Sequence, residues 1–261
     1  MAKNLTKSKF LKGLDAEALL WRVVNQPETI PPPNDIQQKI FDAGNEIGIL
    51  AQQYFPDGID LGNMKTEVNL EATQQALQER KPIFEAGFLA GRCLARVDVL
   101  LPVNTDEWDI IEVKSSTKFK DTYINDLAFQ RYVLESCGLK IRESKLMLLN
   151  NTYIKQGEIS IPDLFYFDNS KHEKVSNFLL KVPALAQRML EVIDLPACPK
   201  FELEDLAKGT YSNVFKDEFK AALPRNTIFE LHGLRTKKKL EWWQSGIHMI
   251  VDMPIDSKTP E

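Results

Sequence analysis

The spacing of apolar residues divides the chain into helical and strand-rich parts. Apolar positions recur at helical spacing in residues 5–25, 36–55 and 69–80. Between the first two lies "PETIPPPND", in which three consecutive prolines favour an extended connector. We therefore expect three helical regions in the first third of the chain, with a non-helical link after the first of them.

The centre of the chain changes to strand-type patterns bounded by turn residues. In chain order, the sequence predicts strands at 82–91, 92–102 and 107–116, a helix at 122–138 closed by glycine, strands at 144–154 and 164–170, and a helix at 172–193 kinked at Pro183. This order predicts an α/β fold with a mixed central sheet. Its first three strands should form an antiparallel meander, and the strand after the crossover helix should pair in parallel.

The chain changes character beyond Pro196. Residues 198–224 show little periodicity, and a compact segment, "TIFELHGLRTKKKLEWWQSGIHMIVDMP", follows at 227–254. We therefore predict a core at 1–195 and a small helical C-terminal extension at 196–261.

Composition narrows the class of protein. The net charge of −4 gives no overall basic footprint, so nucleic-acid binding would have to come from local patches. The three cysteines form no CxxC pair and the three histidines are scattered, which indicates neither a disulfide framework nor a zinc site and fits a reducing cytosol. No apolar stretch resembles a signal peptide or a transmembrane span. We expect a soluble cytoplasmic protein without membrane contact.

The strand "DIIEVK" carries charges where a buried strand should be apolar. Glu112 and Lys114 lie two residues apart and share one face, and a hairpin across "VNTDE" would bring Asp98 close to Glu112. Charges left unpaired in a sheet are costly. Two interpretations remain open: a structural ion-pair cluster that also includes Arg96, or two carboxylates that hold a divalent metal beside a working lysine.

The second interpretation has a consistent chemistry. Mg²⁺ prefers oxygen ligands, and one or two carboxylates are a common protein contribution. A metal held in this way activates water and neutralises phosphate charge. A lysine beside carboxylates keeps its proton and can stabilise negative charge that develops on phosphate.

Several motifs in this region carry a resemblance to a known superfamily. "RVDVLLPVNTDEWDIIEVKSS" resembles the core of the PD-(D/E)xK nucleases, and "DLAFQRYVLESCGL" resembles the glutamine-bearing helix of their RecB-like branch, which includes CRISPR-associated exonucleases. The resemblance covers residues 5–193. It implies a restriction-endonuclease-like core with a mixed central sheet flanked by helices.

The resemblance also implies roles for particular residues. The implied metal ligands are Asp98, Glu112, the backbone carbonyl of Val113 and, as a weaker candidate, Glu85. Lys114 would be the catalytic lysine, and Gln130 would face the site from the next helix. For Glu85 an exposed or paired glutamate is an equal alternative.

The chain departs from the pattern of the branch at three places. A histidine ligand expected in a GxxxH motif is missing, because Gly48 stands there, and nearby Glu46 is interpreted as a surface residue. The tyrosine expected four residues after Gln130 is replaced by Leu134, which leaves Tyr132 as a candidate nucleic-acid contact or a packing residue. Only Cys198 remains of the late cysteines, so no iron–sulfur cluster is expected.

The C-terminal segment has a signal of its own. Residues 228–254 resemble a helix-hairpin-helix, which offers backbone N–H groups and cations to phosphate. The candidate nucleic-acid contacts are Arg235, Lys237, Lys238 and Lys239. The alternative is a packed helical cap with a solvated basic face, since Arg235 stands where a second glycine is common.

The sequence therefore favours a Mg²⁺- or Mn²⁺-dependent DNA nuclease, acting as an exonuclease on single-stranded or duplex ends. A catalytically degenerate DNA-binding or accessory protein with the same fold is the alternative. A third interpretation is a detached module that matches the first part of a longer relative. A protein partner in DNA repair or defence is compatible with each of these.

Overall fold

The computed structural model describes residues 3–207 and 214–253. The chain divides into two compact units, one made of Met1–Leu11 and Pro32–Leu190 and the other of Lys12–Pro31 and Glu191–Glu261. The division after Leu190 lies near the predicted boundary at 195/196, but residues 12–31 belong with the C-terminal part.

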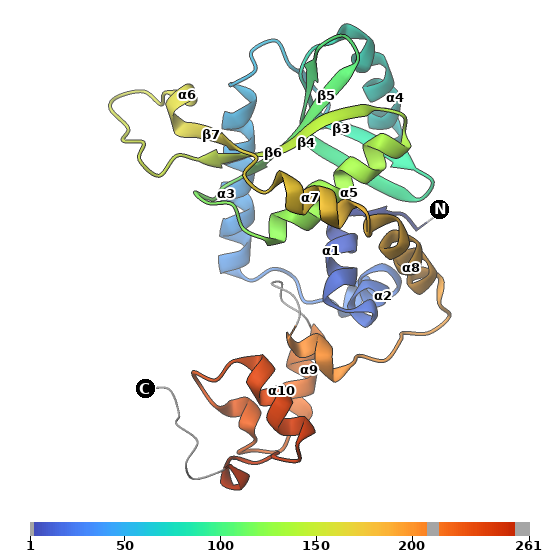
Figure 1. Ribbon diagram of the computed structural model, residues 1–261, viewed down its shortest axis with the longest axis vertical. Helices are drawn as coiled ribbons and strands as arrows, with labels where there is room; N and C mark the ends of the chain where they lie inside the picture. The colour runs from blue at the N-terminus through green and yellow to red at the C-terminus, as the bar shows by residue number, and fades with distance from the viewer. Residues whose placement is uncertain (1–2, 208–213, 254–261) are drawn as a thin grey trace. The chain divides into compact units, whose positions relative to one another are not determined.

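The first unit is built on a seven-stranded mixed sheet (Figure 1). Its strands are β1 (Leu5–Thr6), β2 (Ile59–Asp60), β3 (Ile83–Ala90), β4 (Cys93–Val103), β5 (Glu107–Lys114), β6 (Lys140–Leu149) and β7 (Phe165–Asp168). The order is β2-β3-β4-β5-β6-β7, with β1 paired to β4. Strands β3, β4 and β5 form an antiparallel meander, β6 pairs in parallel with β5, and β7 is antiparallel to β6. The predicted mixed α/β fold with a mixed central sheet is confirmed.

The described residues of the two units also form α-helices. They are α1 (Lys7–Asp15), α2 (Glu17–Asn25), α3 (Asp35–Gln52), α4 (Thr66–Ala76), α5 (Thr122–Ser136), α6 (Ile161–Leu164), α7 (His172–Leu179), α8 (Val182–Asp194), α9 (Val214–Ala222) and α10 (Thr236–Gln244). Short 3-10 helices lie at Pro27–Thr29, Leu77–Glu79, Leu203–Ala207, Ile228–Glu230 and Ile250–Asp252. Among helices in the described ranges, none has both the length and the apolar character needed to cross a bilayer.

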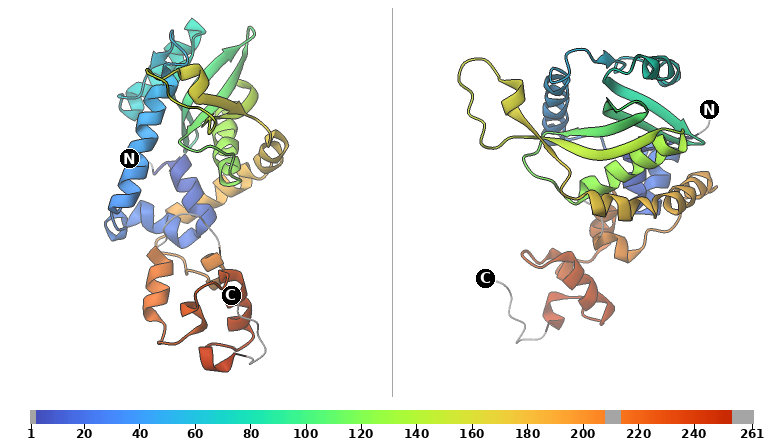
Figure 2. Two further views of the ribbon diagram at one scale, coloured as in Figure 1. Left: turned by 90° about the vertical axis from the view of Figure 1, so that its left-hand side faces the viewer. Right: turned by 45° about the horizontal axis from the view of Figure 1, so that its top comes forward.

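The two faces of the sheet bury different helices. On one face the end of α3, with Ala51 and the following Phe55, packs against Phe84, Val99 and Ile111. Side chains alternate along a strand, so Glu112 points to the opposite face, where α5 lies beside α7 (Figure 1). The segment between β6 and β7, which contains α6, projects from the sheet as an arm (Figure 2).

Several element boundaries differ from the sequence prediction. The helical region predicted at 5–25 is wrong for Leu5–Thr6, which form β1, and it is broken at Ala16, whose backbone is extended. The strand predicted at 144–154 begins at Lys140 and ends at Leu149. Residues 172–193 form two helices, with Pro183 in the first turn of α8, where a missing N–H costs nothing. Helix α9 lies in a segment where no periodicity was recognised.

The second unit has a small aromatic core. Ala18 and Leu19 of α2 pack with Phe215 of α9, whose ring stacks on Phe201. Phe229 packs against Trp243 of α10. Helix α10 is flanked by 3-10 helices rather than by a second α-helix, so the described part of the predicted helix-hairpin-helix segment contains one α-helix. The last residue of that segment, 254, lies outside the described residues.

Candidate active site

The candidate site begins where β4 and β5 separate. The two strands pair from Val103↔Glu107 as far as Val99↔Ile111. Beyond that point the backbone N–H of Val113 donates to a side chain of β4 and not to its backbone. The acceptor is Asp98 Oδ2, at 2.7 Å. The divergence leaves a gap between two otherwise paired strands and fixes the Asp98 carboxyl inside it.

Glu112 is the centre of a buried polar cluster. Its side chain is 1% exposed, and its Oε1 accepts from Lys114 Nζ at 2.6 Å and from Lys7 Nζ at 2.8 Å. Its Oε2 accepts from Gln130 Nε2 at 2.7 Å. Lys114 Nζ also donates to Asp126 Oδ2 at 2.7 Å. Both oxygens of Glu112 are therefore engaged by groups from two helices and its own strand.

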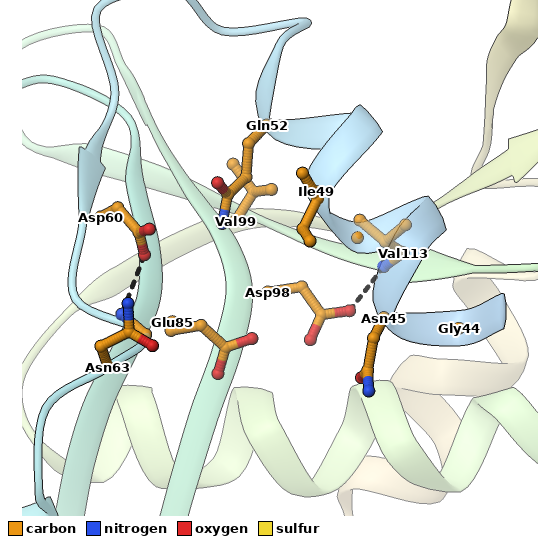
Figure 3. Close-up of a pocket in the computed structure, with 12 residues that line it drawn as sticks. Gly44, Asn45, Ile49, Gln52, Asp60, Asn63, Glu85, Asp98, Val99 and Val113 are labelled. Atoms are coloured by element: carbon orange, nitrogen blue, oxygen red, sulfur yellow. Dashed lines mark hydrogen bonds between the residues drawn. The ribbon is translucent and has the colours of Figure 1, made fainter. Parts of the chain in front are cut away.

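A cavity of 560 Å³ adjoins this cluster (Figure 3). Asp98 and Glu85 point into it from β4 and β3, and Asn45 of α3 and Asn63 lie on its two sides. The full lining is Gly44, Asn45, Gly48, Ile49, Gln52, Asp60, Gly62, Asn63, Glu85, Asp98, Val99 and Val113. The wall is rich in carboxyl and amide oxygen, and it has room for a substrate group.

Glu85 reaches the cavity through an unusual backbone. Its φ is +57°, a left-handed conformation that non-glycine residues rarely adopt within a strand. The buried Asn69 side chain holds this bend by donating to the carbonyl oxygen of Glu85 at 2.9 Å. Asn69 approaches so closely that a Cβ on neighbouring Gly87 would lie 1.9 Å from its Oδ1. Such strain is commonly stored at functional sites.

Burial acts on the pKa of every carboxyl group in the cluster, and the two ammonium groups offset it to different degrees. Burial would raise the pKa of Glu112, but Lys114 and Lys7 outweigh it and hold that pKa well below its usual range. Burial raises the pKa of Asp98 to about 7, and the charge of Glu112 adds to the rise. Burial also raises the pKa values of Asp126 and Glu85.

The two lysines keep their protons. Burial would lower the pKa of Lys114, but Glu112 and Asp126 outweigh this and raise it above its usual range. The same balance, led by Glu112, raises the pKa of Lys7 above its usual range. The cluster therefore holds two fixed positive charges against a larger number of carboxyl groups.

The donor chemistry of the site fits a hard divalent cation. Asp98 and Glu85 point their carboxyl groups into one cavity, and Asp60 also lines it. Asp126 Oδ1 and Gln130 Oε1 are buried and accept no hydrogen bond from the described residues, so the cluster has spare acceptors. Within residues 3–207 and 214–253, however, no three His, Cys, Asp or Glu side chains already lie in a ligand-like group.

The structure brings most of the predicted site residues together. Asp98, Glu112, Lys114 and Gln130 form one cluster, and Val113 and Glu85 line the adjoining cavity. Tyr132 is not brought to them: it is half-buried, and two residues beyond Gln130 it points to another face of α5. Glu46 is exposed on α3, as expected for a surface residue.

The predicted basic contacts belong to the second unit and differ from one another. Arg235, Lys237 and Lys238 are exposed at the start of α10, and Lys238 Nζ pairs with Glu241 at 3.2 Å. Lys239 turns inward and donates to the carbonyl oxygens of Phe229 and Leu231. Lys239 therefore ties α10 to the preceding turn, while the other three cations face solvent.

Two residues of the cluster were missed from the sequence. Asp126 precedes Gln130 by one helical turn, so the shared face of "DLAFQ" could have indicated it. Lys7 lies 105 positions before Glu112. Nothing in the local pattern around it gave a signal.

Comparisons with known proteins add little to this geometry. No protein-family model matches the chain, and a search of curated proteins finds no match. Among solved structures the chain is similar to the alkaline exonuclease LHK-Exo from Laribacter hongkongensis, with a TM-score of 0.34 and 11% identity, over 72% of this chain and 90% of that one. The structure of LHK-Exo in complex with dAMP is similar to the same extent, with a TM-score of 0.34 and 13% identity. A likeness at this level assigns neither a family nor an activity to this chain.

Proposed function

We propose that the protein is a Mg²⁺- or Mn²⁺-dependent nuclease that hydrolyses phosphodiester bonds in DNA, in the manner of an exonuclease. The observation that carries this proposal is the pair formed by Glu112 and Lys114 where β4 and β5 diverge, beside a cavity into which Asp98 points. Their order along the chain is the one that resembles the PD-(D/E)xK nucleases.

Asp98 and Glu85 are the residues that would hold the ion, with Val113 beside them on the cavity wall. When bound, such an ion supplies Lewis acidity that activates water and neutralises charge on phosphate. The protein itself holds both carboxylates in position before the substrate arrives. Glu85 lies on a strand with a left-handed backbone, and Asp98 accepts a hydrogen bond from the backbone N–H of Val113.

Lys114 supplies the fixed positive charge of the site. It retains its proton at neutral pH and is held between Glu112 and Asp126. A positive charge in this partly buried position would stabilise negative charge that develops on a phosphate bound beside it. Gln130 orients Glu112 from α5 and thereby keeps Lys114 in place.

The second unit would contribute binding rather than chemistry. Exposed Arg235, Lys237 and Lys238 can contact phosphates without reading sequence, which suits a nuclease that acts on any DNA end. The three free cysteines fit a cytoplasmic location.

A cleavage assay tests the proposal. End-labelled single-stranded and duplex DNA would be incubated with the protein and Mg²⁺, Mn²⁺ or EDTA, and wild type compared with Glu112→Gln and Lys114→Met. We expect metal-dependent cutting that both substitutions reduce at least 100-fold. A ladder that shortens from one end would establish exonuclease action. Metal-dependent cutting that survives both substitutions would contradict the proposed site.

A second candidate function has a specific observation in its favour. Lys7, Lys114 and Gln130 already engage both oxygens of Glu112, as they would in a purely structural ion cluster. The protein would then be a DNA-binding or accessory protein that keeps the nuclease-like site without cutting. DNA binding by wild type without cleavage in either metal would favour this function.

A further inference from the structure

Lys7 is fixed at the site from both sides. The preceding Leu5 is fully buried and pairs with Cys93 in the parallel β1–β4 ladder. On the other side, Phe10 is fully buried and stacks on Phe129 of α5, with ring centroids 4.7 Å apart. The backbone of Lys7 is therefore held in place by buried residues on both sides. Its ammonium lies 2.8 Å from Glu112 Oε1.

This contact places Lys7 in competition with any ion that would use Glu112. Lys7 and Lys114 share one oxygen of Glu112, and Gln130 takes the other. A divalent ion on Glu112 would lie beside two ammonium groups, and like charges at this range repel strongly in a partly buried site. The carboxyl groups of Asp98 and Glu85 instead point into the first cavity, which Asp60 also lines.

Lys7 is also accessible from a second cavity. This cavity measures 250 Å³ and is lined by Thr6, Lys7, Ser8, Glu85, Leu94, Arg96 and Asp98. The Lys7 side chain is 26% exposed. Removing its ammonium would therefore leave Glu112 Oε1 with Lys114 alone and let water and ions approach that oxygen from this side.

We propose that Lys7 is a resident cation of the site. It neutralises Glu112 and so leaves Asp98 and Glu85 to hold a single divalent ion. The inference rests on the proposed function for the presence of that ion, but it concerns metal binding and not cleavage.

Mn²⁺ titration of the full chain tests this inference, with free Mn²⁺ followed by electron paramagnetic resonance. The variants are Lys7→Met, which removes the charge at similar length, and Lys7→Arg, which keeps the charge. Lys9→Met is the matched control, because Lys9 lies two residues further on in α1 and donates to the carbonyl oxygen of Asn4. We expect Lys7→Met to bind Mn²⁺ at least tenfold more tightly than wild type, and the other two variants to stay within about threefold of wild type.

Folding is monitored for each variant by near-ultraviolet circular dichroism. If Lys7→Met does not fold, Lys7→Gln replaces it, because its amide can still donate to Glu112 without a charge. We expect the same tightening of Mn²⁺ binding for this variant. Equal or weaker Mn²⁺ binding by the folded uncharged variant would overturn the inference, as would the absence of Mn²⁺ binding in all variants.

The two proposals fail in different ways. Tighter Mn²⁺ binding by Lys7→Met in a protein that cuts no DNA would support the role of Lys7 and overturn the nuclease proposal. Unchanged Mn²⁺ affinity in a protein whose wild type cuts DNA with metal would do the reverse.

Discussion

Strand β5 carries two buried carboxylates in very different surroundings. Asp109 is fully buried and accepts hydrogen bonds from Arg142 Nη2 at 2.6 Å and Nε at 3.0 Å, while Lys145 Nζ lies 2.7 Å away. Glu112, three residues on, is also buried and also touches two cations, Lys7 and Lys114. The number of ion pairs therefore does not distinguish the surroundings of Asp109 from those of Glu112.

The difference lies in the neighbouring charges. Around Asp109 the charges are balanced, because Arg142 and Lys145 face two carboxylates, Asp109 and Glu143. Burial would raise the pKa of Asp109, but the two cations outweigh this and hold that pKa below its usual range. Around Glu112 further carboxyl groups share the same two ammonium groups, and burial together with the charge of Glu112 raises the pKa of Asp98 to about 7. A balanced buried cluster stabilises a fold, whereas one with surplus acid beside a cavity is suited to binding a cation or a proton.

The largest effect should come from removing the surplus carboxylate. Asp98→Asn keeps the shape of the side chain but removes its charge, so we expect DNA cleavage to fall roughly 1000-fold, equivalent to about 4 kcal/mol. The rate would be measured on end-labelled DNA at saturating Mg²⁺. Asp109→Asn is the matched control, because it removes a buried carboxylate from the same sheet away from the cavity. Equal losses of cleavage per folded molecule in both variants would contradict the distinction.

The control variant should instead lose stability. Asp109→Asn removes the buried one of the two carboxylates that Arg142 and Lys145 share, and breaking a buried pair of this kind costs about 3 kcal/mol. Urea unfolding at neutral pH would measure this loss. Asp98→Asn should show no comparable loss, because it relieves repulsion from Glu112. A larger loss of stability for Asp98→Asn than for Asp109→Asn would show that the charge balance is misjudged.

The two carboxyl groups should also give opposite slopes of stability against pH. The folded pKa of Asp98 lies above its unfolded value, so wild type should lose stability relative to Asp98→Asn as pH rises from about 4 to about 7. The folded pKa of Asp109 lies below its unfolded value. Its contribution is therefore complete above about pH 4, and the advantage of wild type over Asp109→Asn should shrink as pH falls further. Urea unfolding between pH 3 and pH 8 measures both slopes, and slopes of the same sign would contradict the comparison.

The sequence predicts the part of the site that lies on neighbouring strands. Period-two alternation puts Glu112 and Lys114 on one face, and the short "VNTDE" turn fixes the hairpin register that brings Asp98 opposite them. The same reasoning predicts the meander and the parallel strand after α5, because strand periodicity and a helical crossover are local signals.

Features of the site and the fold that depend on contacts between distant parts of the chain could not be predicted from the local sequence pattern. Lys7 reaches Glu112 because β1, too short to show alternation, pairs beside β4. The inclusion of residues 12–31 in the second unit depends on contacts such as that between Arg22 and Glu218, far apart in the sequence. The sequence singled out Glu85 but could not show its left-handed backbone, which depends on the approach of Asn69.

The smallest expected effect is a difference in stability between two substitutions of Glu85, which separates backbone strain from the loss of charge. Both Glu85→Ala and Glu85→Gly remove the carboxylate, but only glycine adopts a φ of +57° without cost. We therefore expect the glycine variant to be more stable than the alanine variant by about 1 kcal/mol in urea unfolding, although glycine is otherwise unfavourable in a strand. The same pair of substitutions at Asp109, where no left-handed backbone is found, should reverse this order, because glycine there adds only chain entropy to the unfolded state. If alanine is the more stable replacement at both positions, Glu85 stores no strain, and what distinguishes the site from the Asp109 cluster is charge alone.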